Sequence, residues 1–286
     1  MTTNLRPISC ALLATLALPL GAQELPDLET LARKVGAAHR PDGPTAKVEA
    51  FTCKLEIELT DVREKNGGQA GLTVQFLEQP RKAPKKPRTY IRYEVTDAER
   101  PIRRGNDRFG PWHLAQGKPA DLTAAGSEQD LASLREHTNL ARQLVRFLSP
   151  EAVLGALQKP TKVQNDKLRL GRKATPVLSV SGDLERFPLM QNAGDEAPAY
   201  VTIYIDEKSH RLLGVDAWPL KDGKPDRLRG ERIVLESMRP VDGLLVPHTL
   251  RYLWRDASGK LRSHSIARIL KLRLRPELTV ADFNRS

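Results

Sequence analysis

Apolar and polar residues alternate strictly along residues 51–59. Every second position carries an apolar side chain: Phe51, Cys53, Leu55, Ile57 and Leu59. Successive side chains of a strand point to opposite faces of its sheet, so this pattern predicts a strand with one buried face and one wet face. The same alternation returns in residues 72–76 and 91–95, which predicts a series of such strands.

Two segments instead carry apolar residues at the spacing of a helix. In residues 25–39 the stripe comprises Leu28, Leu31, Ala32 and Val35, as in an amphipathic helix. A longer stripe runs through residues 127–149 and predicts the second helix. Ser149 and Pro150 then favour a short helix to about residue 158, because serine is a frequent N-cap and proline suits the first helical turn.

From residue 174 onward the pattern is that of strands. We expect them at residues 177–184, 200–206, 212–218, 231–238, 249–255 and 261–274. The pairs Asp222-Gly223 and Asp242-Gly243 are turn signals at hairpin spacing. The short hydrophobic tail that follows, residues 276–283, is expected to act as a terminal clasp.

This order of elements predicts an α+β fold. Antiparallel strands with helices inserted on one side form such folds, and a twisted sheet of about nine or more strands must curl, close or split. We therefore expect a curled antiparallel sheet, an incomplete β-barrel, covered by helices on its concave side. Residues 23–286 are expected to form this single domain. The periodicity leaves open whether the helices fill the concavity or leave room for a ligand.

The N-terminus has the features of a secretory signal peptide. Arg6 supplies a positive charge, and the apolar run of residues 8–20 is too short to span a bilayer, which takes about 20 residues. Pro19, Gly21 and Ala22 then resemble a cleavage region, so we expect a signal peptide at residues 1–22 and a periplasmic location. Export would leave Cys53 as the one cysteine, without an intrachain disulfide. Its place on the apolar side of a strand predicts a buried, inert thiol.

Charge indicates which surfaces the chain would approach. The net charge is +11, and removal of Arg6 with the signal leaves +10, which favours anionic neighbours such as a membrane surface. Export makes nucleic acid the least expected partner. The densest basic run forms the candidate anionic-surface site: Arg81, Lys82, Lys85, Lys86 and Arg88. Three prolines interleave this run, and a solvated loop between two strands is favoured over a binding patch.

Short motifs follow one another along the chain in an order known from one family. They are Ala50-Phe51 after the first helix, Pro87-Arg88 before a strand, Gly105 with Trp112, Ile205-Asp206 followed by Leu212-Leu213, and the closing Leu278 and Phe283. In this order they resemble the LolA/LolB family of outer-membrane lipoprotein carriers and its RseB-like and LppX-like relatives. One departure is that Asp107 follows the glycine of the third motif, where the family has the aspartate before it.

The resemblance implies an open barrel that encloses a hydrophobic cavity for acyl chains of lipids or lipoproteins. Burial of each CH₂ group contributes about 0.8 kcal/mol, so such a site needs aliphatic and aromatic side chains and no catalytic group. The candidate cavity residues are the inward positions of the expected strands: Phe51, Leu55, Ile57, Leu59, Val74, Phe76, Ile91, Tyr93, Leu250, Tyr252 and Trp254. For each of them ordinary core packing is the favoured interpretation, and only a subset could line a cavity.

No catalytic or metal-binding motif stands out in the sequence. The six histidines are scattered, without the spacing of a zinc site, and no nucleophile motif or phosphate loop is present. We therefore expect no enzyme activity, no cofactor and no metal, and a monomer. Two alternatives to a carrier remain open: an envelope sensor or adaptor that binds a protein or anionic polymer through the basic loop, and a hydrolase with an unrecognised site.

Overall fold

One antiparallel sheet forms most of the protein, seen here in a computed structural model. The structure describes residues 25–43, 48–59, 69–79, 88–97, 103–107, 110–115, 118–121, 139–170, 173–190, 197–255 and 260–283. The sheet has 14 strands. They are β1 (Ala50–Leu59), β2 (Gln69–Gln79), β3 (Arg88–Asp97), β4 (Arg103–Asp107), β5 (Gly110–Ala115), β6 (Lys118–Asp121), β7 (Gln164–Leu170), β8 (Lys173–Phe187), β9 (Ala197–Asp206), β10 (Leu212–Lys221), β11 (Lys224–Pro225), β12 (Glu231–Val241), β13 (Leu244–Arg255) and β14 (Leu261–Leu274).

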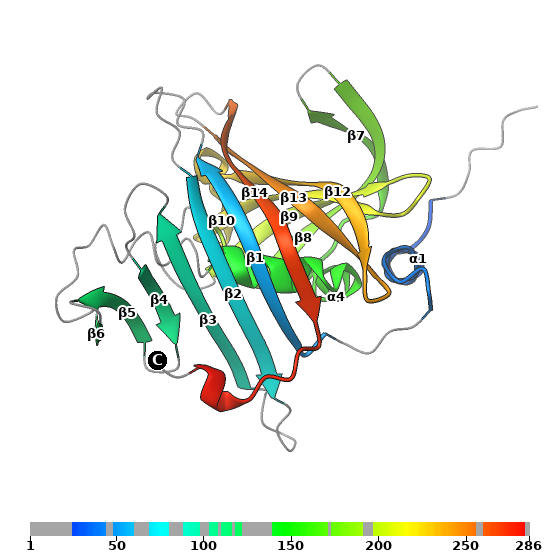
Figure 1. Cartoon of the computed structure of the whole chain (residues 1–286). Helices are drawn as coiled ribbons and strands as arrows, with labels where there is room; N and C mark the ends of the chain where they lie inside the picture. Colours follow the sequence, from blue (N-terminus) through cyan, green and yellow to red (C-terminus); the bar gives the residue numbers. More distant parts are fainter. Residues whose placement is uncertain are drawn as a thin grey trace, which may run out of the picture.

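The first and the last strand of the chain are neighbours in the sheet. It runs β6-β5-β4-β3-β2-β1-β14-β13-β12-β10-β9-β8-β7, with β11 paired to β10. The last strand, β14, therefore lies between the first strand, β1, and β13 (Figure 1). Among the described residues no ladder joins the edge strands β6 and β7, so the sheet curls without closing. This confirms the expected open, curled antiparallel sheet.

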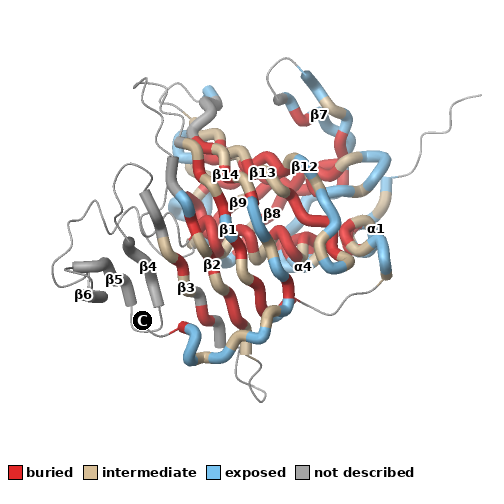
Figure 2. Tube along the Cα trace, in the orientation of Figure 1, coloured by how far each residue is buried: buried red, intermediate tan, exposed pale blue. Residues whose placement is uncertain are grey.

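Helices cover the concave side of the sheet, as expected. They are α1 (Leu28–His39), a helical segment at residues 139–147 that we call the interior helix, and α4 (Pro150–Gly155). Figure 1 shows green helix behind the strands, and Figure 2 shows the buried residues that line this contact. One large apolar cluster combines the inward side chains of the sheet with those of the helices. No helix of the described chain is long and apolar enough to cross a membrane.

The structure differs from the expected elements in several places. Strands β6 and β11 were not predicted. Strand β7 was not predicted, because its sequence, QNDKLRL, is mostly polar. Helix α4 ends at Gly155, before residue 158, and the side chain of its N-cap, Ser149, makes no capping hydrogen bond. Residues 127–138 of the expected second helix lie outside the described residues, and residues 139–147 are helical as expected.

The predicted Asp-Gly turns are present at two hairpins. Asp222 and Gly223 have φ of 52° and 71°, and Asp242 and Gly243 have φ of 48° and 77°. Two successive residues in the left-handed region form the turn that suits the twist of a two-residue hairpin. The second turn joins β12 to β13 and so fixes which of their residues face each other.

The C-terminal tail closes over the first strands as a clasp. Phe283 is fully buried in a small cluster with Ala50, Leu77 and Tyr90, which come from β1, β2 and β3. Its ring lies 5.8 Å from that of Tyr90, and Arg92 donates a hydrogen bond of 3.0 Å to the carbonyl of Asp282. The tail therefore ties three neighbouring strands together at one end.

A buried histidine connects α1 to the sheet. The Nε2 atom of His39 accepts a hydrogen bond of 3.1 Å from the backbone N–H of Leu212, so its Nδ1 carries the proton and donates to the carbonyl of Leu245 at 3.1 Å. His39 is 1% exposed. One side chain thus joins the end of the helix to β10 and β13, and it does so as the neutral imidazole.

Acid is expected to weaken this connection. Burial lowers the pKa of His39 below its usual value of 6.5, against the opposing effects of the Leu245 carbonyl and Glu151. The unfolded chain then binds a proton at His39 more readily than the folded chain, so the free energy of unfolding should fall as the pH drops from about 7 to about 5. Denaturant titrations of the wild type and His39→Gln at several pH values measure this. An equal fall in both proteins would contradict the prediction.

Candidate functional site

The predicted cavity residues lie on the inner face of the sheet. Eight of them are at most 6% exposed and share one apolar cluster: Phe51, Leu55, Ile57, Val74, Phe76, Tyr93, Leu250 and Tyr252. Trp254 is partly buried and packs against the same cluster. The side chains of Leu59 and Ile91 lie outside the described residues. The structure thus brings nine candidates together, and whether they line a ligand site stays a prediction.

The interior helix occupies the space in front of this face. Its apolar side chains Leu140, Ala141, Leu144 and Phe147, with Leu148 directly after it, are buried in the same cluster. The hollow left between the helix and β1, β13 and β14 has a volume of about 10 Å³. Ligand pockets usually measure about 300–1,000 Å³. Where the described helix meets β1, β13 and β14, its side chains therefore leave no room for a ligand.

Polar side chains tie the interior helix to the segment after β8. Asn139 donates a hydrogen bond of 2.8 Å to the carbonyl of Leu189, and the amide of Gln143 donates to the carbonyl of Pro188 at 2.5 Å. Gln143 also donates to Glu231 at the start of β12, over 3.1 Å. All these contacts are buried. If the helix shifted slightly, each group would lose its hydrogen-bond partner and could not bind water in its place.

Glu231 is the buried acid at the centre of this contact. It is 2% exposed, and its second oxygen accepts a hydrogen bond of 2.9 Å from the backbone N–H of Met190. Tyr252 is also completely buried. Burial, followed by the negative charge of Glu231, raises the pKa of the Tyr252 phenol well above its usual value. The phenol therefore keeps its proton, and its oxygen has no hydrogen-bond partner among the described residues.

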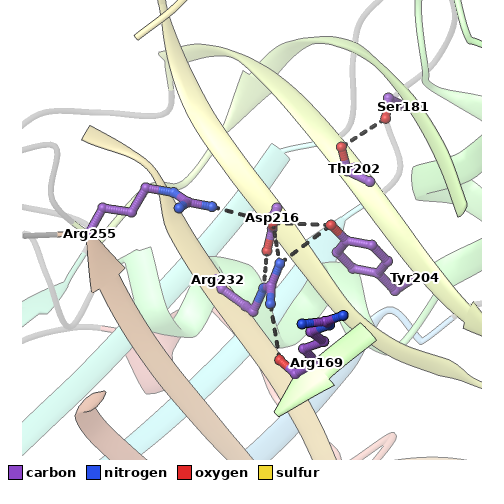
Figure 3. A network of polar contacts seen from close by, with 7 residues as sticks. All are labelled: Arg169, Ser181, Thr202, Tyr204, Asp216, Arg232 and Arg255. Carbon is purple, nitrogen blue, oxygen red and sulfur yellow. Dashed lines mark hydrogen bonds and ion pairs between the residues drawn. The ribbon is translucent and has the colours of Figure 1, made fainter. Parts of the chain in front are cut away.

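A second polar network lies on the opposite, outer face of the sheet (Figure 3). Asp216 on β10 is 2% exposed and binds the guanidinium of Arg232 on β12 through two contacts, of 2.5 and 2.7 Å. The phenol of Tyr204 donates to the same carboxylate at 3.1 Å, and Arg255 approaches it to 3.9 Å. Arg232 also donates to the carbonyl of Arg169 on β7, which lies over this face.

Tyr204 and Arg232 in this network both have raised pKa values. Burial, then the charge of Asp216, raises the pKa of Tyr204 far above its usual value, and the hydrogen bond to Asp216 helps raise the pKa of Arg232 despite burial. At neutral pH the tyrosine is therefore a donor and the arginine a cation, with Asp216 as their common acceptor. A carboxylate with its oxygens so fully occupied stabilises the strand pairing and is poorly placed to act as a base.

Within the described segments, the remaining reactive residue types do not gather. His39 bridges backbone groups, and His248 contacts the carbonyl of Val246 on its own strand. Burial raises the pKa of Cys53 to about 12, so its thiol is protonated, as the sequence predicts. No group of three or more His, Cys, Asp or Glu side chains that could hold a metal ion is found in the part of the chain that the structure describes.

Two further surfaces bear on the candidate sites. The basic loop with Arg81, Lys82, Lys85 and Lys86 lies outside the described residues, and Arg88 is placed by its backbone alone. A groove of about 450 Å³ lies between α1 and α4, beside Gly36 and the ion pair of Arg40 with Glu151 at 2.5 Å. This groove was not foreseen, because it depends on how two helices cross.

Comparison with known proteins finds similarity in structure alone. No family model and no curated protein matches the chain. Among solved structures, the chain is similar to an outer membrane lipoprotein-sorting protein domain from Vibrio parahaemolyticus (11% identity, TM-score 0.47, 90% of this chain and 96% of that chain). It is also similar to a LolA superfamily protein from Nitrosomonas europaea (12%, 0.43, 91% and 99%) and a DUF1329 family protein from Desulfovibrio piger (10%, 0.47, 90% and 95%).

Removal of Asp216 should destabilise the protein strongly. Asp216→Asn leaves the half-buried Arg232 without the carboxylate that binds it, and breaking a buried ion pair in this way costs up to about 3–5 kcal/mol. The double variant Asp216→Asn with Arg232→Met removes both charges and should recover much of this loss. Urea unfolding of the single and double variants measures the difference. If the single variant were as stable as the wild type, the network would have no structural role.

Proposed function

We propose that this chain is an exported, periplasmic carrier or binder of lipids or lipoproteins, which holds acyl chains against the concave face of its sheet. The observation that supports this most is the chemistry of that face. The nine candidate residues and the interior helix present a continuous apolar surface to each other. An acyl chain needs such a surface and no reactive group.

An acyl chain would replace the interior helix. Four large side chains leave the core if the helix moves away: Leu140, Leu144, Phe147 and Leu148. Their exposure costs about 6–12 kcal/mol at about 1.5–3 kcal/mol each, and burial of about 14 methylene groups returns about 11 kcal/mol. The two terms are of the same size, so the exchange of helix for ligand is close to balanced.

The buried hydrogen bonds of Asn139 and Gln143 favour the closed state. A ligand that binds only the open state has an apparent affinity reduced by the fraction of molecules that are open. These bonds would therefore set the affinity without touching the ligand. We propose an acyl chain as the ligand because the sequence motifs resemble those of the LolA/LolB family. We propose a periplasmic location for the protein because residues 1–22 have the features of a signal peptide.

The first test is whether the protein carries lipid. Protein purified from the periplasm without detergent is expected to begin at residue 23 or 24 and to release acyl lipids that mass spectrometry detects. Stripped of lipid, it should take up a fluorescent fatty acid with a saturable signal. Protein that carries no lipid and takes up no acyl probe would rule out the proposed function.

The second test weakens the contact that holds the helix. Gln143→Ala removes hydrogen bonds to Pro188 and Glu231, one of them to a charged group worth about 1.5–3 kcal/mol. A loss of about 1.4 kcal/mol raises the open fraction tenfold, so the apparent Kd for the fatty acid should fall by about tenfold or more.

The matched control is Arg146→Ala on the same helix. Its side chain donates a hydrogen bond to the carbonyl of Arg186 at an exposed site and lies 5.9 Å from the centre of the Phe187 ring, and exposed contacts of these kinds are each worth at most about 1 kcal/mol. This variant should change the Kd much less than Gln143→Ala. Equal or weaker binding by Gln143→Ala, in a protein that still folds, would mean that the helix does not occlude the site.

A further inference from the structure

The sheet is split along part of its length between β13 and β14. The ladder that joins these two strands ends at the pair Thr249 and Arg268. Beyond it, β14 stays paired with β1 as far as Leu274, and β13 stays paired with β12 as far as Leu244. Residues 269–274 and 244–248 are thus paired on one side each, and the strands diverge with helix behind them (Figure 1). We call this opening the seam.

The seam leads directly to the interior helix. The hollow of about 10 Å³ described above lies here, lined by Val246 and Pro247 of β13, Leu272 of β14, and Phe147 and Leu148 at the end of the interior helix. Leu272 packs against the apolar cluster but is only partly buried, unlike Ile269 on the same strand. At the seam, therefore, side chains alone separate the core from the outside.

The outer rim of the seam carries three unpaired positive charges. Lys54 of β1 lies directly opposite Lys271 of β14, and Arg273 follows two residues further along. All three are exposed, and none forms an ion pair within the described part of the chain. Like charges placed opposite each other destabilise a strand pair. By contrast, Arg268, just beyond the seam, pairs with Glu56 and Glu58.

An exposed leucine accompanies these charges. Leu270 lies at the irregularity where the register between β1 and β14 shifts, and it is 65% exposed. Figure 2 shows this exposed part of β14 beside the buried strand interior. The seam thus combines three cations with an exposed apolar side chain, close to the apolar core. This combination suits a molecule that has an anionic headgroup and an apolar chain. Lysine and arginine donate several charge-assisted hydrogen bonds, which suits a phosphate with its several oxygens.

We propose that the seam is the entrance through which an acyl chain reaches the core, and that Lys54, Lys271 and Arg273 bind the phosphate of the lipid that carries it. This rests on the proposed function and adds the route and the headgroup. No ladder hydrogen bond joins the two strands here, and at the far end the backbone N–H of Leu274 donates a hydrogen bond of 3.3 Å to the side chain of Asp242, which would have to break for the strands to separate fully. The chain would enter beside Leu272 and displace Phe147 and Leu148 first.

A charge-removal variant tests the headgroup site. In Lys54→Gln, Lys271→Gln and Arg273→Gln combined, the Kd for a fluorescent monoacyl glycerophosphate should rise by about tenfold or more, which corresponds to the loss of one charge-assisted hydrogen bond. The Kd for a monoacylglycerol with the same labelled chain should not change. The control removes exposed charges elsewhere, in Lys221→Gln, Lys224→Gln and Arg229→Gln, and should bind both probes as the wild type does. Far-ultraviolet circular dichroism checks that each variant folds.

A reversible crosslink tests the route. His248→Cys and Leu270→Cys, in a Cys53→Ala background, place thiols on the two strands of the seam, at a half-buried and an exposed position that a cleavable bis-maleimide can reach. The joined protein should lose uptake of both probes and regain it after the spacer is cleaved. Uptake that persists in the joined protein would place the entrance elsewhere, and an equal effect of charge removal on both probes would exclude the headgroup site.

These outcomes separate the two proposals. If the wild type and Gln143→Ala bind neither probe, the proposed function fails and the entrance falls with it. If both bind the probes but the seam variants and the crosslink change nothing, the protein is an acyl binder with another entrance.

Discussion

The structure depends on covering the apolar concave face of a curled sheet. A face that includes Phe51, Val74, Leu250 and Tyr252 cannot remain in water, and the interior helix covers it. The curl itself follows from the strand order, because β14 joins the N-terminal strands to the C-terminal ones into one sheet too long to stay flat. Whatever covers this face is therefore in competition with any apolar ligand of the same site.

The two buried polar networks act differently under this constraint. Asp216 and Arg232 join neighbouring strands on the outer face, so their contacts persist whether or not the interior helix moves. Gln143 and Glu231 join the helix to the sheet, so their hydrogen bonds exist only while the helix is in place. The first network stabilises the pairing of strands in the sheet. The second network favours one position of the interior helix against the sheet. A core covered by apolar contacts alone would have no such preference for one position of the helix.

Much of the fold, but little of the site's mechanics, was accessible from sequence. Strict alternation predicted β1, and the helical stripe predicted α1, because each signal lies within one element. Strand β7 is mostly polar, and it pairs on one side with β8. The pairs Asp216–Arg232 and Gln143–Glu231 join different elements, so they depend on a register and a helix position that no local pattern encodes. The seam likewise results from where a ladder ends, which periodicity does not reveal.

The interior helix packs directly behind the seam, so the two features act together in the proposed function. The end of the helix, at Phe147 and Leu148, lies behind the seam, whereas its buried hydrogen bonds lie nearer its described start, at Asn139 and Gln143. In the proposed entry, an apolar chain would first meet Phe147 and Leu148, where packing and the exposed hydrogen bond of Arg146 to the carbonyl of Arg186 hold the helix, and it would replace the packing contacts methylene by methylene. The polar end stays attached until enough surface has been exchanged to offset its hydrogen bonds. Under the proposed function, this arrangement would exclude short apolar molecules and admit long ones, since only a long chain would bury enough surface to release the helix.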